Sequence, residues 1–559
     1  MKKNIFNLFY FAVLVLMIFS CSTTKTVDTL EEKGEYSSEE FIENKIEQIE
    51  KISTTDSVKA FWYSYLLYNE YKDFEKVTKN FESNFDNAIN QISKLYESQN
   101  WMDFCRDYES INKILSKCDL SKININFDKN LFQEKYFFAK NNIASLYSEN
   151  ILPAKNSLSE KISTVIDGTV TIWIDLGVKI ESGRAFSNKA IGSGFFIDSR
   201  GYLITNYHVI SSQVDPEYEG ISRLFIKLGD DKETRIPAKV IGYDKSLDLA
   251  LLKTEIPPKY VFSLGSSSSL DIGDKIYAIG SPVGLERTLT SGIVSAEGRQ
   301  LFSLGTVMQI DAAVNNGNSG GPIIDEFGNV QAIVFAGMLE YQGLNFAIPV
   351  EYLRQDLPFL YNGGKRNHSW IGAYGHTMKE GLKNTGLEIQ YVMPGGTASR
   401  ADIKKGDVIT FVDNKRVYSL ENMQDILRNY GSEVIISCNY QRDGESKATL
   451  LYLDERPKYP GYEIYKSDLI SNSFIPIFGM ELVSASGHSQ RKFVISDILK
   501  GSVADESGFS VTDPVYVSGI DFSEKKDAIA IQINTRRKKR GYLDVSIMLT
   551  SSLDSPYYF

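Results

Sequence analysis

"DAAVNNGNSGGPII" (311–324) places a loop of small residues between two apolar runs. Gly, Asn and Ser are common in turns because they tolerate positive φ or cap their own backbone. The same loop could present Ser319 as a nucleophile, with the N–H groups of Gly317 and Ser319 pointing at one spot to hold an oxyanion. A serine attacks a carbonyl only when a base accepts its proton. The loop therefore needs a histidine and an acid elsewhere in the chain.

The candidate base is His208, the one histidine of four that lies in the β-rich middle of the chain. It follows an apolar run in "GYLITNYHVI" (201–210), where a lone histidine is more often structural than catalytic. Two carboxylates in "YDKSLDLALLK" (243–253) are candidates for orienting it. Asp248 opens a buried-looking strand and would need a partner such as the Nδ1–H of a histidine, whereas Asp244 is expected to be solvated. The order His208, Asp248, Ser319 is that of the chymotrypsin-type proteases.

Composition excludes some classes of protein. A net charge of −10 gives no support for nucleic-acid binding, which usually shows a basic face. Four cysteines in 559 residues exclude a disulfide scaffold. We expect no metal and no cofactor.

The N-terminus predicts export. Lys2 and Lys3 precede an apolar run from Phe9 to Phe19 that is too short for a comfortable membrane span. The end of this run, "IFSC" (18–21), resembles a bacterial lipobox, so we predict a signal peptide over 1–20, lipidation of Cys21 and a polar tether over 21–38. An uncleaved anchor and a plain secretory signal are the alternatives. All three place the chain in the bacterial cell envelope, periplasmic or surface-facing.

Residues 39–155 are predicted to form a helical domain. A tetratricopeptide-like array is one possible arrangement, although its period is not clean. On one continuous helix Cys105 and Cys118 would lie ~20 Å apart, so we expect two unpaired thiols. Aromatic stripes at this spacing usually form core; the apolar positions that recur at helical spacing include Phe81, Phe85, Ala88, Ile92, Trp101, Phe104, Tyr108, Phe132, Tyr136, Ala139 and Ile143.

Residues 160–360 change to short β-like runs that Gly, Asp and Pro interrupt, which indicates barrels or a sandwich. The runs are 169–176, 193–198, 202–206, 249–255, 275–280 and 330–337.

An internal repeat follows, over 365–456 and 460–559. "PGGTASRADIKKGDVI" (394–409) matches "KGSVADESGFSVTDPV" (500–515), with Gly395 and Gly501 lying 106 positions apart. Such repeats indicate tandem domains of one fold. The basic run 536–540 then falls at a hairpin turn and is interpreted as solvated, with contact to anionic lipid as a weaker alternative.

Several stretches together resemble the HtrA (Deg) family of exported serine proteases. They are "GSGFFIDSRGYLITNYHVI" (192–210), "DLALLK" (248–253), "IGDKIYAIGSPVGL" (272–285), "TLTSGIVSAEGR" (288–299), "DAAVNNGNSGGPIID" (311–325) and "LNFAIPVEYL" (344–353). The resemblance implies a multidomain fold: the N-terminal helical domain, a chymotrypsin-like double β-barrel and two PDZ-like α+β domains. It makes His208 the base, Asp248 its orienter and Ser319 the nucleophile.

The resemblance also implies partners and an activity. PDZ domains bind peptide C-termini, and the loop carried over for this is Trp370, Ile371, Gly372 and Ala373. We expect a membrane-tethered endopeptidase that cleaves unfolded or damaged envelope proteins, with a homotrimer possible. The alternative is a peptide-binding or chaperone-like scaffold with latent proteolysis. Ala313, six residues before Ser319, argues against cleavage after Lys or Arg and favours a small or medium apolar residue there.

Overall fold

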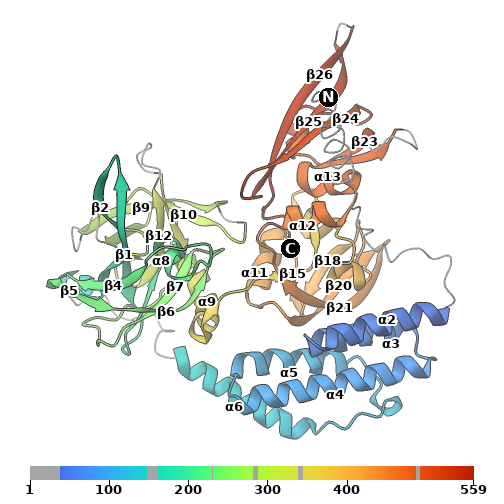
Figure 1. Ribbon diagram of the computed structural model, residues 1–559, viewed down its shortest axis with the longest axis horizontal. Helices are drawn as coiled ribbons and strands as arrows, with labels where there is room; N and C mark the ends of the chain where they lie inside the picture. Colours follow the sequence, from blue (N-terminus) through green and yellow to red (C-terminus); the bar gives the residue numbers. More distant parts are fainter. Residues whose placement is uncertain are drawn as a thin grey trace, which may run out of the picture.

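The computed structural model describes residues 38–147, 162–229, 231–280, 288–301, 303–315, 317–337, 344–485, 491–539 and 541–559. It has an N-terminal helical region, a domain of barrel-like sheets and two smaller domains of sheet and helix (Figure 1), which agrees with the predicted fold class. We call the last three the peptidase domain and the first and second PDZ domains, after that prediction. The predicted signal peptide and Cys21 lie outside the described residues. No helix in these ranges is long and apolar enough to cross a membrane.

The helical region buries the apolar faces expected from the sequence: Phe81, Phe85, Ala88 and Ile92 are fully buried. Cys105 and Cys118 are free thiols, as predicted, and α5 ends before Cys118. Consecutive helices pack against each other as an array (Figure 1). The helices are α2 (Ser38–Ser53), α3 (Ser57–Glu70), α4 (Glu75–Glu97), α5 (Trp101–Leu115), the 3-10 helix η1 (Leu120–Lys122) and α6 (Lys129–Tyr147).

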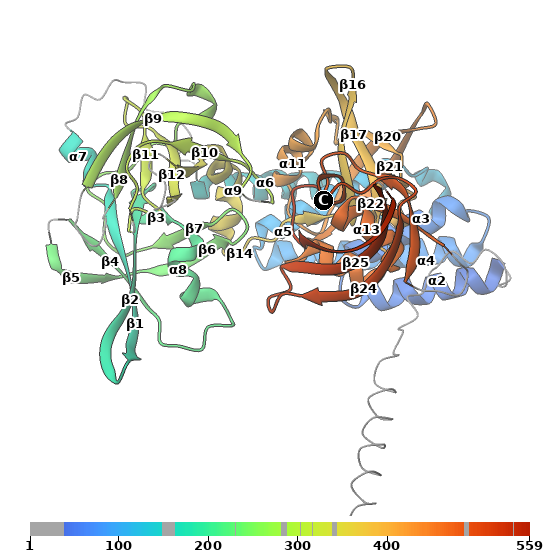
Figure 2. The same ribbon diagram turned by 90° about the horizontal axis from the view of Figure 1, so that it is seen from above.

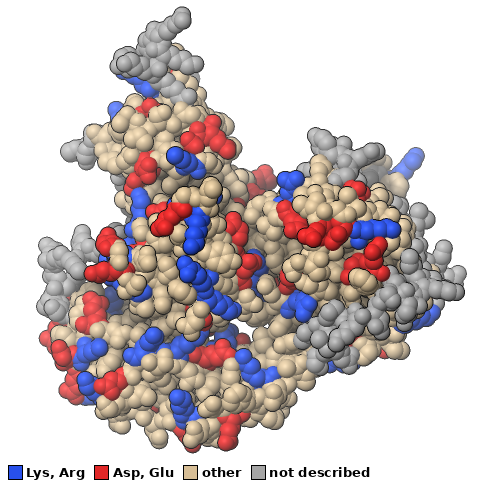
Figure 3. Space-filling model, turned by 180° about the vertical axis from the view of Figure 1, so that it is seen from behind, with Lys and Arg blue, Asp and Glu red and all other residues tan. Residues whose placement is uncertain are grey.

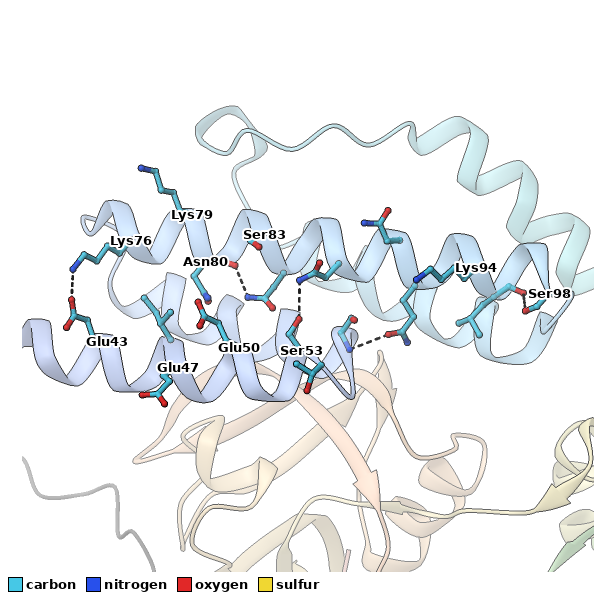
Figure 4. Close-up of a pocket in the computed structure, with 18 residues that line it drawn as sticks. Glu43, Glu47, Glu50, Ser53, Lys76, Lys79, Asn80, Ser83, Lys94 and Ser98 are labelled. Atoms are coloured by element: carbon cyan, nitrogen blue, oxygen red, sulfur yellow. Dashed lines mark hydrogen bonds and ion pairs between the residues drawn. The ribbon is translucent and has the colours of Figure 1, made fainter.

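A polar groove runs between α2 and α4 (Figure 4). Lys76 pairs with Glu43 across it at 2.5 Å, and Asn87 Nδ2 donates to Ser53 Oγ at 3.1 Å. The groove lies in the helical region, away from the peptidase domain that carries α8 (Figure 1).

The helical region shares one apolar core with the first PDZ domain. Trp62 is fully buried, and its Nε1 donates to Leu450 O at 2.9 Å. Ser110 Oγ accepts from the Ile435 N–H at 3.0 Å, and Lys113 pairs with Asp413 at 2.5 Å. Two views show these helices lying along the sheet of that domain (Figures 1 and 2).

The peptidase domain contains an eight-stranded sheet in the order β14-β6-β7-β3-β2-β1-β4-β5 and a closed barrel β10-β13-β12-β11-β8-β9. The predicted runs 275–280 and 330–337 coincide with β8 and β12. Its elements are α7 (Ile162–Ile166), β1 (Thr169–Glu181), β2 (Arg184–Phe196), β3 (Tyr202–Thr205), α8 (Tyr207–Val214), β4 (Arg223–Leu228), β5 (Asp231–Pro237), β6 (Lys239–Asp244), β7 (Leu249–Lys253), η3 (Ser267–Ser269), β8 (Lys275–Gly280), β9 (Thr288–Arg299), β10 (Val307–Ile310), β11 (Pro322–Ile324), β12 (Val330–Gly337), β13 (Asn345–Pro349), α9 (Val350–Asn362) and β14 (Gly364–Lys365).

The first PDZ domain is a seven-stranded sheet whose main order is β15-β21-β20-β18-β17-β16, so β16 lies at its edge. The second is a five-stranded sheet, β22-β23-β24-β25-β26. The first contains β15 (Ser369–Trp370), β16 (Ala373–Glu380), β17 (Lys383–Val392), α10 (Thr397–Arg400), β18 (Val408–Val412), β19 (Lys415–Arg416), α11 (Leu420–Arg428), β20 (Val434–Arg442) and β21 (Glu445–Glu455). The second contains α12 (Pro460–Ser467), α13 (Ile470–Phe478), β22 (Met480–Ser484), β23 (Lys492–Ile498), α14 (Val503–Glu506), β24 (Pro514–Phe522), β25 (Ala528–Lys539) and β26 (Gly541–Ser552).

The internal repeat is visible in the backbone. The Ile389 N–H donates to Asp407 O at 2.9 Å, and the Ile495 N–H donates to Asp513 O at 3.1 Å in the second copy. The predicted hairpin of the second copy is β25–β26, in which Arg536 pairs with Asp544. The copies differ at one wall: α11 has no counterpart between β24 and β25, which residues 523–527 join directly.

Candidate active site

His208 and Asp248 are in direct contact. His208 lies in the first turn of α8, directly after β3, and Asp248 lies in the turn before β7. The His208 Nδ1 and Asp248 Oδ2 atoms are 2.7 Å apart, and the His208 backbone N–H donates to Asp248 Oδ1 at 2.7 Å. A carboxylate at Nδ1 requires the proton there, which leaves Nε2 free to accept one.

The turn that carries Asp248 is fastened to the start of α8. Asp248 has a φ of 56°, a left-handed conformation that Asp tolerates better than most residues. Its carbonyl oxygen accepts from Asn206 Nδ2 at 2.9 Å and from the Tyr207 N–H at 3.2 Å. The side chain of Asp248 is 8% exposed and that of His208 is 47% exposed, so the acid is buried behind a base that faces solvent.

The Ser319 loop is bonded to the first sheet. The Ser193 N–H donates to Ser319 O at 2.8 Å, and Ser193 Oγ donates to Gly317 O at 2.6 Å. Gly320 has a φ of 84°, and a Cβ there would lie 2.3 Å from Ser193 O. Gly317 has a φ of 104°. The glycines therefore allow this close approach and these left-handed conformations.

Among the described residues, the Ser319 hydroxyl is bonded to a backbone carbonyl oxygen and not to the base His208. Its Oγ donates to Phe335 O on β12 at 3.3 Å, and the His208 and Phe335 rings are 6.5 Å apart between centroids. Among the described residues no hydrogen bond joins His208 Nε2 to Ser319 Oγ. Such bonds are often absent from the free enzyme and form only when substrate is present.

Asp244 corrects an expectation from the sequence: it is fully buried and not solvated. Its Oδ2 lies 2.7 Å from His368 Nε2, and its Oδ1 accepts from the Ser246 N–H at 2.7 Å. Burial raises the pKa of Asp244 and lowers the pKa of His368 to about 3, so His368 is neutral in its contact with Asp244. Asp244 is therefore paired with His368, while His208 is paired with Asp248.

The predicted PDZ loop lies between β15 and β16. Trp370 pairs with Asp454 of β21, and Ile371 O accepts from the Ala398 N–H at 2.9 Å. Gly372 has a φ of 77° and Ala373 begins β16. The four residues therefore connect the end of β15 to the start of the edge strand β16, to which only Ala373 belongs. Sequence reasoning missed Asn206 and Ser193, whose roles depend on residues distant in the chain.

Family models match four parts of the chain. Residues 192–333 match the trypsin-like peptidase domain, which covers the segments of His208, Asp248 and Ser319. Residues 388–438 match the PDZ domain and 461–553 the TP0546 family PDZ domain. Residues 40–128 match a domain of unknown function, DUF8517.

Curated relatives of this peptidase–PDZ chain share its central part. The "Probable periplasmic serine endoprotease DegP-like" of Marinomonas sp. (strain MWYL1) is 32% identical over 283 residues, covering 48% of this chain and 58% of the relative. The protein of the same name from Hahella chejuensis is 35% identical over 241 residues, covering 41% and 49%. The chain thus spans about half the length of these relatives. The resemblance to the HtrA (Deg) family is confirmed.

Two solved structures are also similar. "HtrA-type protease AlgW with decapeptide" is 25% identical, covers 53% of this chain and 98% of that one, and has a TM-score of 0.45. "Crystal structure of the serine endoprotease from Yersinia pestis" is 26% identical, covers 53% and 99%, and has a TM-score of 0.40.

Proposed function

We propose that the chain is a serine endopeptidase with His208 as the general base, Asp248 as its orienting acid and Ser319 as the nucleophile. The observation that carries the proposal is the 2.7 Å contact between His208 Nδ1 and Asp248 Oδ2. It fixes the imidazole with Nε2 as the proton acceptor. The peptidase model over 192–333 and the names of the relatives support the same reaction.

The reaction forms and then hydrolyses an acyl-enzyme. The Ser319 hydroxyl turns from Phe335 O toward His208 Nε2, which accepts its proton as Oγ attacks the peptide carbonyl. The N–H groups of Gly317 and Ser319 stabilise the oxyanion. His208 then gives the proton to the leaving amine, and the same base activates a water that releases the acyl group. Asp248 stays ionised and holds the imidazolium.

The substrate and location are parts of the same proposal. We assign unfolded or damaged envelope proteins as substrates, and binding of their C-termini to Trp370–Ala373. The word "periplasmic" in the relatives' names supports an envelope location. Lipidation of Cys21 comes from the lipobox-like sequence, and homotrimeric assembly comes from the resemblance alone. The visible face carries mixed charges (Figure 3), so it provides no single-sign surface as an alternative clue to partners.

A fluorophosphonate probe tests the nucleophile directly. The wild-type protein should be labelled on Ser319, and Ser319→Ala should abolish the labelling because the attacking oxygen is gone. Intact-mass analysis before and after the reaction measures it. A wild-type protein that stays unlabelled with unfolded protein present would instead support the scaffold with latent proteolysis.

Cleavage should follow a small or medium apolar residue. Ala313, whose carbonyl oxygen accepts from Thr290 Oγ1 at 2.9 Å, stands where a trypsin-like pocket carries an acid. Without that acid a Lys or Arg side chain would enter with its charge unpaired. Mass spectrometry of a digested peptide library should show at least about tenfold more cuts after Ala, Val or Leu than after Arg. A library cut mainly after Arg would refute this preference.

A further inference from the structure

The edge strand β16 is paired with the last three residues of the sequence. The Ala373 N–H donates to Phe559 O at 3.0 Å, and the Phe559 N–H donates to Ala373 O at 3.0 Å. The Gly375 N–H donates to Tyr557 O at 3.2 Å, and Tyr374 and Tyr558 form an antiparallel bridge. We call residues 557–559 the tail segment. It continues the sheet past β16 by one strand, at the point where the edge would otherwise present free donors.

Side chains of the tail segment alternate between two buried sites. Phe559 is 3% exposed and joins the apolar core of the first PDZ domain, next to Gly375. Tyr558 is 1% exposed on the opposite side, where its hydroxyl donates to Pro476 O at 2.9 Å. Gln424 of α11 donates to Pro556 O at 2.6 Å. The segment therefore lies between the strand and the helix of this domain.

Main-chain pairing with an edge strand, combined with pockets for alternate side chains, is how PDZ domains recognise an extended peptide. Ala373 both ends the proposed peptide loop and makes two of the bonds to Phe559. We propose that the tail segment is a built-in ligand of the first PDZ domain, which closes the groove to other peptides until the segment leaves. The ligand class is an extended peptide with an aromatic side chain at the position of Phe559. This rests on the proposed peptide-binding role of the loop.

Three features explain why the groove stays closed. The N–H groups of Ala373 and Gly375 cannot serve a second strand while the tail segment holds them. A tethered segment has an effective concentration of about 1 mM, which a free peptide must overcome. Asp554, just before the segment, is also bonded to Arg456 at 2.6 Å and to Ser303 Oγ of the peptidase domain at 2.7 Å.

The test measures binding of a fluorescent Asp-Ser-Pro-Tyr-Tyr-Phe peptide, the sequence of residues 554–559, by anisotropy to the full chain. Phe559→Asp places a charge in the apolar pocket and should release the segment, so the peptide should bind about tenfold or more tightly than to wild type. Leu543→Asp is the matched control, because it adds the same charge at a 58%-exposed position of β26 and should bind like wild type.

Hydrogen exchange of the wild-type protein keeps the proposal testable if Phe559→Asp does not fold. The Ala373 and Gly375 amides should be protected in wild type, exposed in Phe559→Asp and protected again when the peptide is added. Equal peptide binding to wild type and Phe559→Asp, no binding to either, or unprotected amides in wild type would each overturn the inference. None of these results bears on fluorophosphonate labelling of Ser319, which judges the peptidase proposal separately.

Discussion

Asp248→Asn should lower kcat by about 10⁴-fold at neutral pH. The carboxamide can still accept the His208 backbone N–H, so the loop keeps its place. Its NH₂ group, however, would face Nδ1 and favour the tautomer that carries its proton on Nε2. His208 could then no longer accept the proton of Ser319. Initial rates on a fluorogenic apolar peptide, in parallel with the rate of fluorophosphonate labelling, measure the loss.

Asp215→Asn is the matched control for this substitution. Asp215 directly follows α8 and lies 3.4 Å from Lys245, and among the described residues no hydrogen bond joins it to the imidazole. Its removal should change kcat by less than about twofold, since pairs near the surface contribute little. If Asp248→Asn and Asp215→Asn had the same kcat, Asp248 would not be the orienting acid.

Arg366→Met should lower the free energy of unfolding by about 3–5 kcal/mol. Arg366 is almost fully buried between the peptidase and first PDZ domains, 3.5 Å from Asp356. Its Nη2 donates to Arg428 O at 2.9 Å and to Tyr430 O at 2.8 Å. Methionine can keep the contact with the Phe359 ring but leaves the carboxylate and both carbonyls unpaired. Denaturant titration followed by tryptophan fluorescence measures the change.

The loss in the free energy of unfolding caused by Arg366→Met, here called the deficit, should also depend on pH. Burial and neighbouring Asp244 raise the pKa of Asp356 well above its usual range, while Arg366 opposes this rise. Without Arg366 the pKa of Asp356 rises further in the folded state. The folded state then keeps the proton on Asp356 to a higher pH than the unfolded state does. Stability then falls as the pH rises, and the deficit should be smaller at about pH 5 than at about pH 8.

Lys365→Met provides the control for Arg366→Met. Lys365 is the preceding residue, and it pairs with Glu455 at 2.8 Å while both side chains are about half exposed. Its loss should cost less than about 1 kcal/mol at either pH. A similar cost for both variants would show that the buried cation is not what holds this joint together.

Local patterns were enough to predict the helical region and several strands of the peptidase domain. The short β-like runs 275–280 and 330–337 are strands with the predicted bounds, because turn residues close each run. The repeat predicted two related domains. In the structure the matched residues Gly395 and Gly501 both have positive φ, at 72° and 74°. His208 and Asp248 were identified from chain order and from the need of a buried carboxylate for a partner, and the structure places them in contact.

Long-range contacts could not be predicted in this way. Asp244 looked solvated because its partner, His368, lies 124 residues further on and on another domain. The pairing of Phe559 with Ala373 joins an end of the chain to a distant strand edge, which no local period encodes. The absence of a helix between β24 and β25 was also hidden, because the repeat was matched on the residues that flank this stretch.

The shared core of the helical region and the first PDZ domain has a consequence for biosynthesis. Topologically these two parts form a single host into which the peptidase domain is inserted as a guest. Trp62 and Leu450 are 388 residues apart. The helices therefore leave the ribosome long before the strands that cover Trp62, and their apolar face stays open while the guest is made. The surface around Trp62 is therefore covered only after the strands of the first PDZ domain have been made.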